Sequence, residues 1–424
     1  MEGSIHPTVI TATPARRAPF YAILGANAIS MHGNALAQLA LPWFVLATTG
    51  SAAKTGLAAF AGLLPLIISA FFGGAIVDRL GHKRASVIAD LASMVTVALI
   101  PLLHGLGLLN FGLLLALIFL GAVLDAPGVT ARAALVPDLI ALGRFRPERA
   151  NTAHEVIESG AVFAGPIGAG ILIAAFGPGV ALWFNAASFL VSASFVAFAV
   201  PTLRVAAEEV ASAGYLADLA AGLRFVLRDP PLRAIFLSAA VISFLFSPLF
   251  GVVLPFYIKT TYDSATALGL IIGAFGGGGV LGALVYAAGA HRLPRRVTFV
   301  GGVFAICGGF VALTPLPPLP LMVAAFFLAG LISGPNGPLI NTILQERTPQ
   351  ALRGRVFGAT TALCYAGSPL GVLAAGALLQ PLGVQPVLIA SAVIFSAVAL
   401  ALAFDRGLYI LDEADKGEGE LAAQ

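Results

Sequence analysis

The chain has 424 residues, of which 59% are hydrophobic and 10% are charged, and its net charge is +3. Soluble globular proteins carry about 25% charged residues, so this chain has too few charges to cover a water-facing surface and is predicted to be an integral membrane protein. The composition excludes a disordered chain, a disulfide scaffold and a nucleic-acid-binding protein, because each needs residues that this sequence lacks.

Twelve apolar runs follow one another along the chain, each long enough to cross the roughly 30 Å of hydrocarbon in a bilayer. The first six cover residues 20–48, 55–77, 85–107, 110–132, 153–175 and 180–201. The second six cover residues 232–257, 266–290, 297–314, 319–342, 355–379 and 385–404. The segment before the first run has no apolar core, so we expect no cleavable signal peptide.

The connecting segments predict the orientation, because Lys and Arg accumulate in cytoplasmic loops. Of the 23 Lys and Arg residues, only Lys54 and Lys259 fall on the side opposite the N-terminus. We therefore expect both termini to be cytoplasmic. The sequence contains no Asn-x-Ser/Thr glycosylation site, which favours the inner membrane of a prokaryote.

The longest polar stretch runs from Leu203 to Arg233 and divides the twelve runs six and six. We expect an N-terminal six-helix bundle over residues 1–202, a cytoplasmic linker over 203–231, and a C-terminal six-helix bundle over 232–424 that ends in a short acidic tail. The linker segment from Tyr215 to Leu227 has the spacing of an amphipathic helix on the membrane surface. A bare linker is the alternative.

The two halves also repeat one another. Pro147 before the fifth run and Pro166 within it correspond to Pro349 and Pro369 in the second half, at nearly the same offset. A near-constant spacing with the same topology predicts two parallel six-helix repeats around an axis normal to the membrane. Chance similarity of Pro and Gly in apolar helices is the alternative.

The loop after the second run carries a motif that reads Gly74-Ala75-Ile76-Val77-Asp78-Arg79-Leu80-Gly81-His82-Lys83-Arg84. It resembles the signature loop of the major facilitator superfamily, with His82 in place of the usual Arg. The fifth run contains Gly165, Pro166 and Gly170, similar to an element of the antiporter branches of that family, with Ala169 as a departure. The chain resembles the bacterial drug and siderophore exporters of the superfamily. A plain positive-inside loop and a simple helix kink are the alternatives.

The resemblance covers the whole apolar region and implies a secondary transporter in which two bundles rock around a central cavity. It also implies that Asp78, Arg79 and Arg84 belong to a cytoplasmic gate, together with Gly74, Gly81 and Lys83 of the same loop. Four further residues lie near the predicted membrane interface, and we interpret them as parts of the gate network: Asp90, Arg132, Arg149 and Glu155.

Charged side chains within hydrocarbon cost at least about 2.5–3.5 kcal/mol and are functional candidates by default. Asp125 in the fourth run and Glu158 in the fifth are the candidates for proton coupling, because a carboxylate in this position can take up and release a proton as its solvation changes. The alternative is a static ion pair, with Asp125 toward Arg132 and Glu155 toward Arg149 or the loop.

Polar side chains in three of the runs are candidates for the cavity wall. On the first run they form one stripe at helical spacing, which should face the protein or water and not lipid. The predicted cavity residues are Asn27, Asn34, Gln38, Asn336, Asn341 and Tyr365. Phe244, Phe246, Phe250 and Phe256 are available as apolar walls, although core packing explains a phenylalanine equally well.

The sequence therefore predicts a proton-coupled exporter of amphiphilic or hydrophobic organic molecules, working by alternating access and driven by the proton gradient. It predicts no metal and no other cofactor, and the resemblance favours a monomer. The alternatives are an uptake carrier or facilitator for a neutral solute, a lysolipid flippase, and more remotely a non-transporting membrane receptor. A membrane-embedded enzyme is disfavoured, because no nucleophile, base or metal-ligand set converges.

Overall fold

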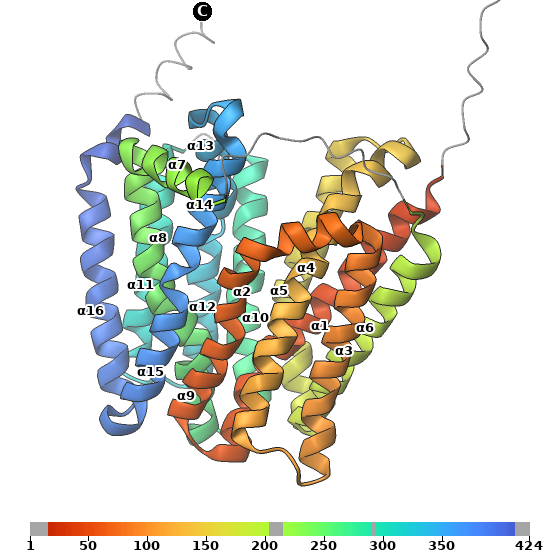
Figure 1. Cartoon of the computed structure of the whole chain (residues 1–424). Coiled ribbons are helices and arrows are strands. Elements are labelled where there is room, and N and C mark those ends of the chain that lie inside the picture. The colour runs from red at the N-terminus through yellow and green to blue at the C-terminus, as the bar shows by residue number, and fades with distance from the viewer. Residues whose placement is uncertain (1–15, 203–214, 290–292, 412–424) are drawn as a thin grey trace, which may run out of the picture.

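The computed structural model describes residues 16–202, 215–289 and 293–411, and every regular element in these ranges is a helix (Figure 1). The expected acidic tail lies outside the described residues. The first half contains six helices, as expected: α1 (Ala18–Thr49), α2 (Ala52–Leu80), α3 (His82–Gly105), α4 (Phe111–Gly143), α5 (Pro147–Phe176) and α6 (Pro178–Ala199).

The second half begins with α7 (Tyr215–Arg228), and its membrane-length segments follow. Three of the six predicted spans are divided into shorter helices. The second-half elements are α8 (Pro230–Pro248), η1 (Leu249–Val253), α9 (Leu254–Thr261), α10 (Ala265–Ala288), α11 (Arg295–Leu313), α12 (Leu319–Ser333), α13 (Asn336–Arg347), η3 (Gln350–Leu352), α14 (Arg353–Ala366), α15 (Ser368–Leu382) and α16 (Val384–Ala403).

The divisions occur at Pro and Gly residues. Gly334 and Pro335 separate α12 from α13, and Gly367 separates α14 from α15. The turn η1 is a π-helical insertion in which the Leu254 N–H bonds the Leu249 carbonyl five residues back. Proline has no N–H to donate and disturbs the preceding turn, so Pro255 accounts for the insertion before it.

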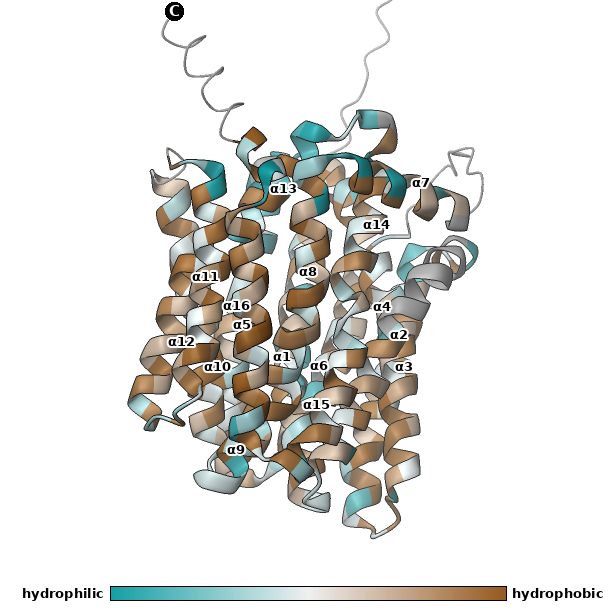
Figure 2. Cartoon of the chain, turned by 90° about the vertical axis from the view of Figure 1, so that its left-hand side faces the viewer, coloured by the Kyte–Doolittle hydropathy of each residue, from teal (hydrophilic) through white to brown (hydrophobic). Residues whose placement is uncertain are grey.

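Ten helical segments in the described residues are long and apolar enough to cross a membrane. The helices α1 and α2, of 32 and 29 residues, run beside them. Together they are consistent with the twelve predicted spans. Figure 2 shows apolar residues along most of each helix and hydrophilic residues gathered at the ends, around α7 and α13 above all.

The predicted amphipathic helix in the linker is present as α7, which lies across the ends of the other helices (Figure 1). We call this end of the molecule the linker side, and the opposite end, where α1 meets α2 and α9 meets α10, the far side. Arg355 Nε of α14 bonds Asp218 Oδ1 of α7 at 2.8 Å. A Cβ on Gly222 would lie 2.2 Å from the Arg355 carbonyl oxygen, so α7 packs directly on the second half.

The helices of each half pack mainly with one another, and the most extensive contacts between the halves are those of α5 with α10 and of α2 with α15. A Cβ on Gly56 of α2 would lie 2.5 Å from the Val372 carbonyl oxygen of α15, and a Cβ on Gly269 of α10 would lie 2.4 Å from the Pro166 carbonyl oxygen of α5. Such distances require glycine, because the two backbones are in direct contact.

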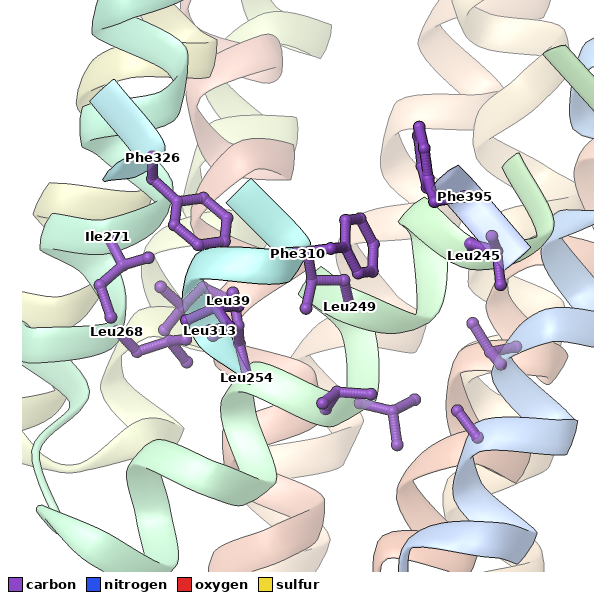
Figure 3. Packing of buried hydrophobic residues seen from close by; sticks show 14 of the residues in the cluster. Leu39, Leu245, Leu249, Leu254, Leu268, Ile271, Phe310, Leu313, Phe326 and Phe395 are labelled. Carbon is purple, nitrogen blue, oxygen red and sulfur yellow. The ribbon is translucent and has the colours of Figure 1, made fainter. Parts of the chain in front are cut away.

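The close contacts between the halves lie toward the far side. One buried apolar cluster contains Leu39 of α1 together with Leu254, Leu268 and Ile271 of the second half (Figure 3). The halves come together in the lower part of Figure 1, where α2 packs beside α15, and diverge toward α7. Among the described residues, the halves therefore meet on the far side more closely than on the linker side.

Candidate transport site

A cluster of charged and polar side chains lies inside the first half, away from lipid. Asp90 of α3 is fully buried, and its Oδ1 lies 2.5 Å from Nη1 of Arg132 on α4. Ser192 of α6 donates to Asp90 Oδ2 at 2.7 Å, and Arg132 Nη2 donates to Ser30 Oγ of α1 at 3.3 Å. Further hydrogen bonds to the members of a buried ion pair offset part of its desolvation cost. The buried charge cluster, Ser30, Asp90, Arg132 and Ser192, thus joins four helices.

Asp125 extends this cluster along α4. It lies two helical turns from Arg132, and its Oδ2 accepts a hydrogen bond from Asn34 Nδ2 of α1 at 3.0 Å. Its other oxygen, Oδ1, is buried without a hydrogen-bond partner among the described residues. A buried unpaired carboxylate oxygen is costly, and an ionisable side chain within a membrane-spanning helix is a functional candidate.

The contacts follow from helical periodicity. Ser30 and Asn34 are four residues apart on α1, and Asp125 and Arg132 are seven apart on α4, so each pair lies on one helix face. Sequence reasoning proposed Asn34 for the cavity and Asp125 for proton coupling, and the structure brings the two side chains into contact. It missed Ser30 and Ser192. Ser30 could have been found, since it lies between Asn27 and Asn34 on the polar stripe of α1 at helical spacing.

The structure places Asp90 and Arg132 differently from the predicted gate position. Both side chains are almost completely buried inside the first half and bond each other, and neither bonds the loop at residues 79–84. The considered static pair between Asp125 and Arg132 is also absent, because Arg132 is paired with Asp90 instead. The reason is tertiary: α3 packs against the same face of α4 and supplies a nearer carboxylate.

Glu158 lies on the face of α5 that approaches the second half. Val162 and Phe163, one turn further along this face, contact Gly276 and Gly277 of α10. Glu158 itself is exposed, one turn toward the linker side from that contact. Glu155 and Arg149 are also exposed. The considered pair between them is not among the ion pairs of the described residues.

The predicted cavity residues do not share one surface. Asn27 is 6% exposed and enclosed within the first half, whereas Gln38 is exposed. The stripe on α1 is therefore divided between helix packing and an open surface. In the second half, Asn336 donates to the Phe299 carbonyl oxygen at 3.3 Å and packs on Gly302 of α11. Asn341 and Tyr365 are exposed.

The motif of the fifth span is a packing element in this structure. A Cβ on Gly165 would lie 2.4 Å from the Ala35 Cβ of α1, and a Cβ on Gly170 would lie 2.6 Å from the Ala265 carbonyl oxygen. Pro166 presents its carbonyl oxygen to Gly269 of α10. The three residues therefore let α5 fit between α1 and α10, where the two halves meet.

The predicted gate loop lies at the linker side, between α2 and α3. Gly81 ends α2 with φ of 79°, a conformation that favours glycine, and also begins α3. Arg79 and Arg84 are exposed and Lys83 is half-buried. The side chain of Asp78 and the surroundings of Gly74 lie outside the described residues.

The second half contains a cluster of aromatic rings. Phe246, Phe250 and Phe275 form a triangle with ring centroids 4.8–5.5 Å apart, and Phe326 meets Phe250 edge to face at 5.9 Å. Of the four predicted wall residues, Phe246 and Phe250 belong to this aromatic cluster. The rings are tilted or edge to face, as aromatic groups prefer, and they pack against the buried apolar core.

Known proteins resemble this chain along most of its length. Residues 23–372 and 239–418 match the family described as Major Facilitator Superfamily. The multidrug efflux pump Tap of Mycolicibacterium fortuitum is 34% identical over 410 residues, which are 95% of this chain and 100% of that protein. The enterobactin exporter EntS of Citrobacter koseri is 29% identical over 383 residues, 88% of this chain and 87% of that one.

The fold itself resembles a solved transporter. The crystal structure of the nucleoside transporter NupG matches with a TM-score of 0.74 at 12% sequence identity, covering 91% of this chain and 98% of that one. At this identity the likeness concerns the arrangement of the helices and not the cargo.

Proposed function

The chain belongs to the major facilitator superfamily of membrane transporters, and from this premise we propose that it exports amphiphilic organic molecules in exchange for protons bound at Asp125. It is a multi-pass membrane protein and a transporter, not an enzyme. Both a multidrug pump and a siderophore exporter are relatives over most of the chain, which supports efflux as the direction.

One observation carries the coupling mechanism. Asp125 lies within a membrane-length helix, bonds Asn34 through one oxygen, and keeps the other oxygen buried and unpaired. A carboxyl group in such a place is more stable with a proton than without one, unless a cation approaches it. Its charge therefore depends on which side of the membrane supplies water to it. This dependence is what a proton-coupled cycle requires.

The linker side is, in our proposal, the cytoplasmic side of a prokaryotic inner membrane, because nearly all Lys and Arg fall there. Both termini would then be cytoplasmic. The halves are in close contact on the far side and diverge toward the linker side, which corresponds to an inward-facing conformation. Cargo would enter from the cytoplasm, and rocking of the two halves would expose it to the outside.

The aromatic cluster in the second half and the absence of unpaired buried cations among the described residues favour hydrophobic or amphiphilic cargo. Phe246, Phe250 and Phe275 are half-buried rings that pack against one another and against the apolar core, and in our proposal they form part of the apolar wall that the cargo meets. A sugar phosphate or nucleotide would instead require Arg or Lys free to bind phosphate. The one deeply buried arginine described, Arg132, is already paired with Asp90.

The test uses proteoliposomes with an imposed pH gradient and a lipophilic fluorescent dye as the transported probe. We expect the native protein to transport the dye when the proton concentration is higher on the side of the membrane opposite to the dye. Asp125→Asn should abolish gradient-driven transport and retain dye binding. Asp138→Asn is the matched control, since it makes the same change on α4 nearer the linker side. Intact gradient-driven transport in Asp125→Asn would rule out Asp125 and direct attention to Glu158.

A further inference from the structure

Arg132 pairs with the carboxylate of Asp90 and lies two helical turns from the carboxylate of Asp125. Its Nη atoms bond Asp90 and Ser30, but its buried Nε has no hydrogen-bond partner among the described residues. Asp125 has the corresponding unpaired acceptor, because its buried Oδ1 accepts no hydrogen bond from the described residues. Buried polar atoms in native proteins are nearly always paired. An unpaired donor group and an unpaired acceptor on the same face of α4 indicate that these groups have a second arrangement.

The space between Arg132 and Asp125 is occupied by a glycine. Gly128 lies on the same face of α4, one turn from each of them, and has no side chain to separate them. A Cβ on Gly128 would lie 3.6 Å from Arg132 Nη1 and 3.7 Å from Asp90 Oδ1. The guanidinium thus already reaches back over Gly128. One further helical turn, about 5.4 Å, brings it to Asp125.

Asp90 would still have hydrogen-bond donors nearby if Arg132 moved away. Ser192 already donates to its Oδ2. Ser86 and Ser93 lie one turn to either side of Asp90 on α3, and the buried hydroxyl groups of both have no partner among the described residues. Three hydroxyl groups could therefore solvate the Asp90 carboxylate while the arginine is elsewhere, which lowers the cost of leaving it buried.

Few other titratable groups face this region. Asp125 interacts electrostatically with Arg132 and Asp90. From α1 it meets Asn34, whereas His32 lies on another face, donates to the Ala28 carbonyl oxygen and points toward Gly160 of α5. The remaining charged or titratable side chains described on α2 and α5 lie at the ends of α2 or along α5: Lys54, Arg79, Arg149, His154, Glu155 and Glu158.

We propose that Arg132 is a positioning residue that changes partner from Asp90 to Asp125, across the gap at Gly128, when Asp125 releases its proton. The proposal rests on the proposed function, because it assumes that Asp125 carries the proton. Protonated Asp125 is neutral, so the arginine pairs with Asp90, as in this structure. When the proton leaves to water, Asp125 becomes negative and attracts the arginine, and the contacts of Asp90 and Ser30 with it are released.

The exchange links the proton to helix packing. In the present arrangement Arg132 connects α4 to both α3 and α1 through Asp90 and Ser30. With Asp125 as its partner, the arginine lies along α4 and next to Asn34 of α1. Each proton event thereby changes which helices of the first half are bonded to one another. This is a physical route from proton binding to the rocking of the bundle.

The first test removes both members of the resident pair. Asp90→Asn/Arg132→Gln has no net change in charge and can form a neutral hydrogen bond in the same place. With partner exchange, ionised Asp125 loses its cation, so the pH midpoint of gradient-driven efflux should rise by about one to three units. With a static Asp90–Arg132 pair, the midpoint should stay within a few tenths of a unit. Dye binding serves as the check that the variant is folded.

The second test leaves all charges in place. Gly128→Ala alone would clash, because its Cβ would lie 2.8 Å from the Ala89 Cβ. The double variant Ala89→Gly/Gly128→Ala transfers that methyl group across the helix contact, and Ala89→Gly alone is the matched control. A Cβ at position 128 is compatible with the Asp90 pair but obstructs the path to Asp125. We expect the same upward shift of the midpoint in the double variant and none in the control.

The outcomes separate this proposal from the proposed function. If Asp125→Asn abolishes gradient-driven transport while both double variants keep the native midpoint, Asp125 carries the proton and the exchange of partners is wrong. If Asp125→Asn transports normally, the coupling residue itself is wrong. Shifted midpoints in both double variants, with a native midpoint in Ala89→Gly, are the result that supports the exchange.

Discussion

Nζ of Lys259 on α9 lies over the ring of Trp43 on α1, 5.1 Å from the ring centroid, and joins the two halves of the molecule on the far side. Lys54, the other lysine expected outside, lies over Phe111 at 5.3 Å within the first half. The two cation–π contacts differ in their place, because the Lys259 contact lies between the halves and the Lys54 contact lies inside the first half.

Replacing Lys259 by Gln should loosen the far-side closure. A cation–π contact contributes about 0.5–1 kcal/mol at exposed sites, which corresponds to a two- to fivefold change in the population of the conformation open on the far side. Distances between spin labels on α1 and α9 would measure that population. Lys54→Gln, the matched control, should leave it unchanged. Equal behaviour of the two variants would contradict a gating role for Lys259.

Gly56→Val should disfavour the conformation described here. The Cβ alone would lie 2.5 Å from the Val372 carbonyl oxygen, and overpacking of this kind costs about 1–3 kcal/mol. Because only the far-side contact is affected, we expect the halves to separate there and transport to fall at least tenfold. Thiol labelling from the far side would detect the opening. Gly308→Ala on α11, where no atom lies within 4 Å of the added Cβ, should label and transport as the native protein does.

Asn34→Ala should impair proton coupling more than folding. Hydrogen bonds to charged groups contribute about 1.5–3 kcal/mol, and Asn34 makes the one hydrogen bond described for Asp125. Losing that donor makes the ionised carboxyl less stable, so we expect the pH midpoint of gradient-driven efflux to rise. Gln38→Ala, which removes an exposed amide from the same helix, is the control. A native midpoint in Asn34→Ala would show that this hydrogen bond is irrelevant to coupling.

Arg355→Gln should detach α7 from the second half at little cost in global stability. The Arg355–Asp218 pair is partly exposed, with side-chain exposures of 36% and 23%, and such pairs contribute at most about 1 kcal/mol. We expect a small decrease in the melting temperature and faster proteolysis between α6 and α8. The reversed pair, Asp218→Arg/Arg355→Asp, should restore protection from protease. Unchanged proteolysis in Arg355→Gln would instead mean that packing at Gly222 holds α7 in place without help from the ion pair.

Sequence reasoning was most successful where a property is local. The apolar runs predicted the helices, and the spacing from Tyr215 to Leu227 predicted α7. Gly334 and Pro335 are residues that interrupt helices, and the structure divides the helix there. The roles assigned to individual site residues remain predictions, because the structure shows where these side chains lie and not what they carry.

It was least successful where two distant helices decide the outcome. Asp90 and Arg132 were expected near the gate, and the structure buries them together. Asn27 and Gln38 share a helix face by periodicity, yet one is enclosed and the other is exposed. Periodicity orients a side chain around its own helix, but it does not say which neighbouring helix stands opposite.

The amino-acid sequence alone placed this protein in a membrane and predicted twelve spans in two similar halves, with its ionisable spanning residues in one half. These properties follow from hydropathy, chain length and charge, which are sums over residues. Only the tertiary structure decided that Arg132 bonds Asp90 while Asp125 keeps an unpaired oxygen, and that the halves meet on the far side. Such pairings depend on distances of a few ångströms between helices far apart in the chain, and electrostatic and packing energies change steeply over that range.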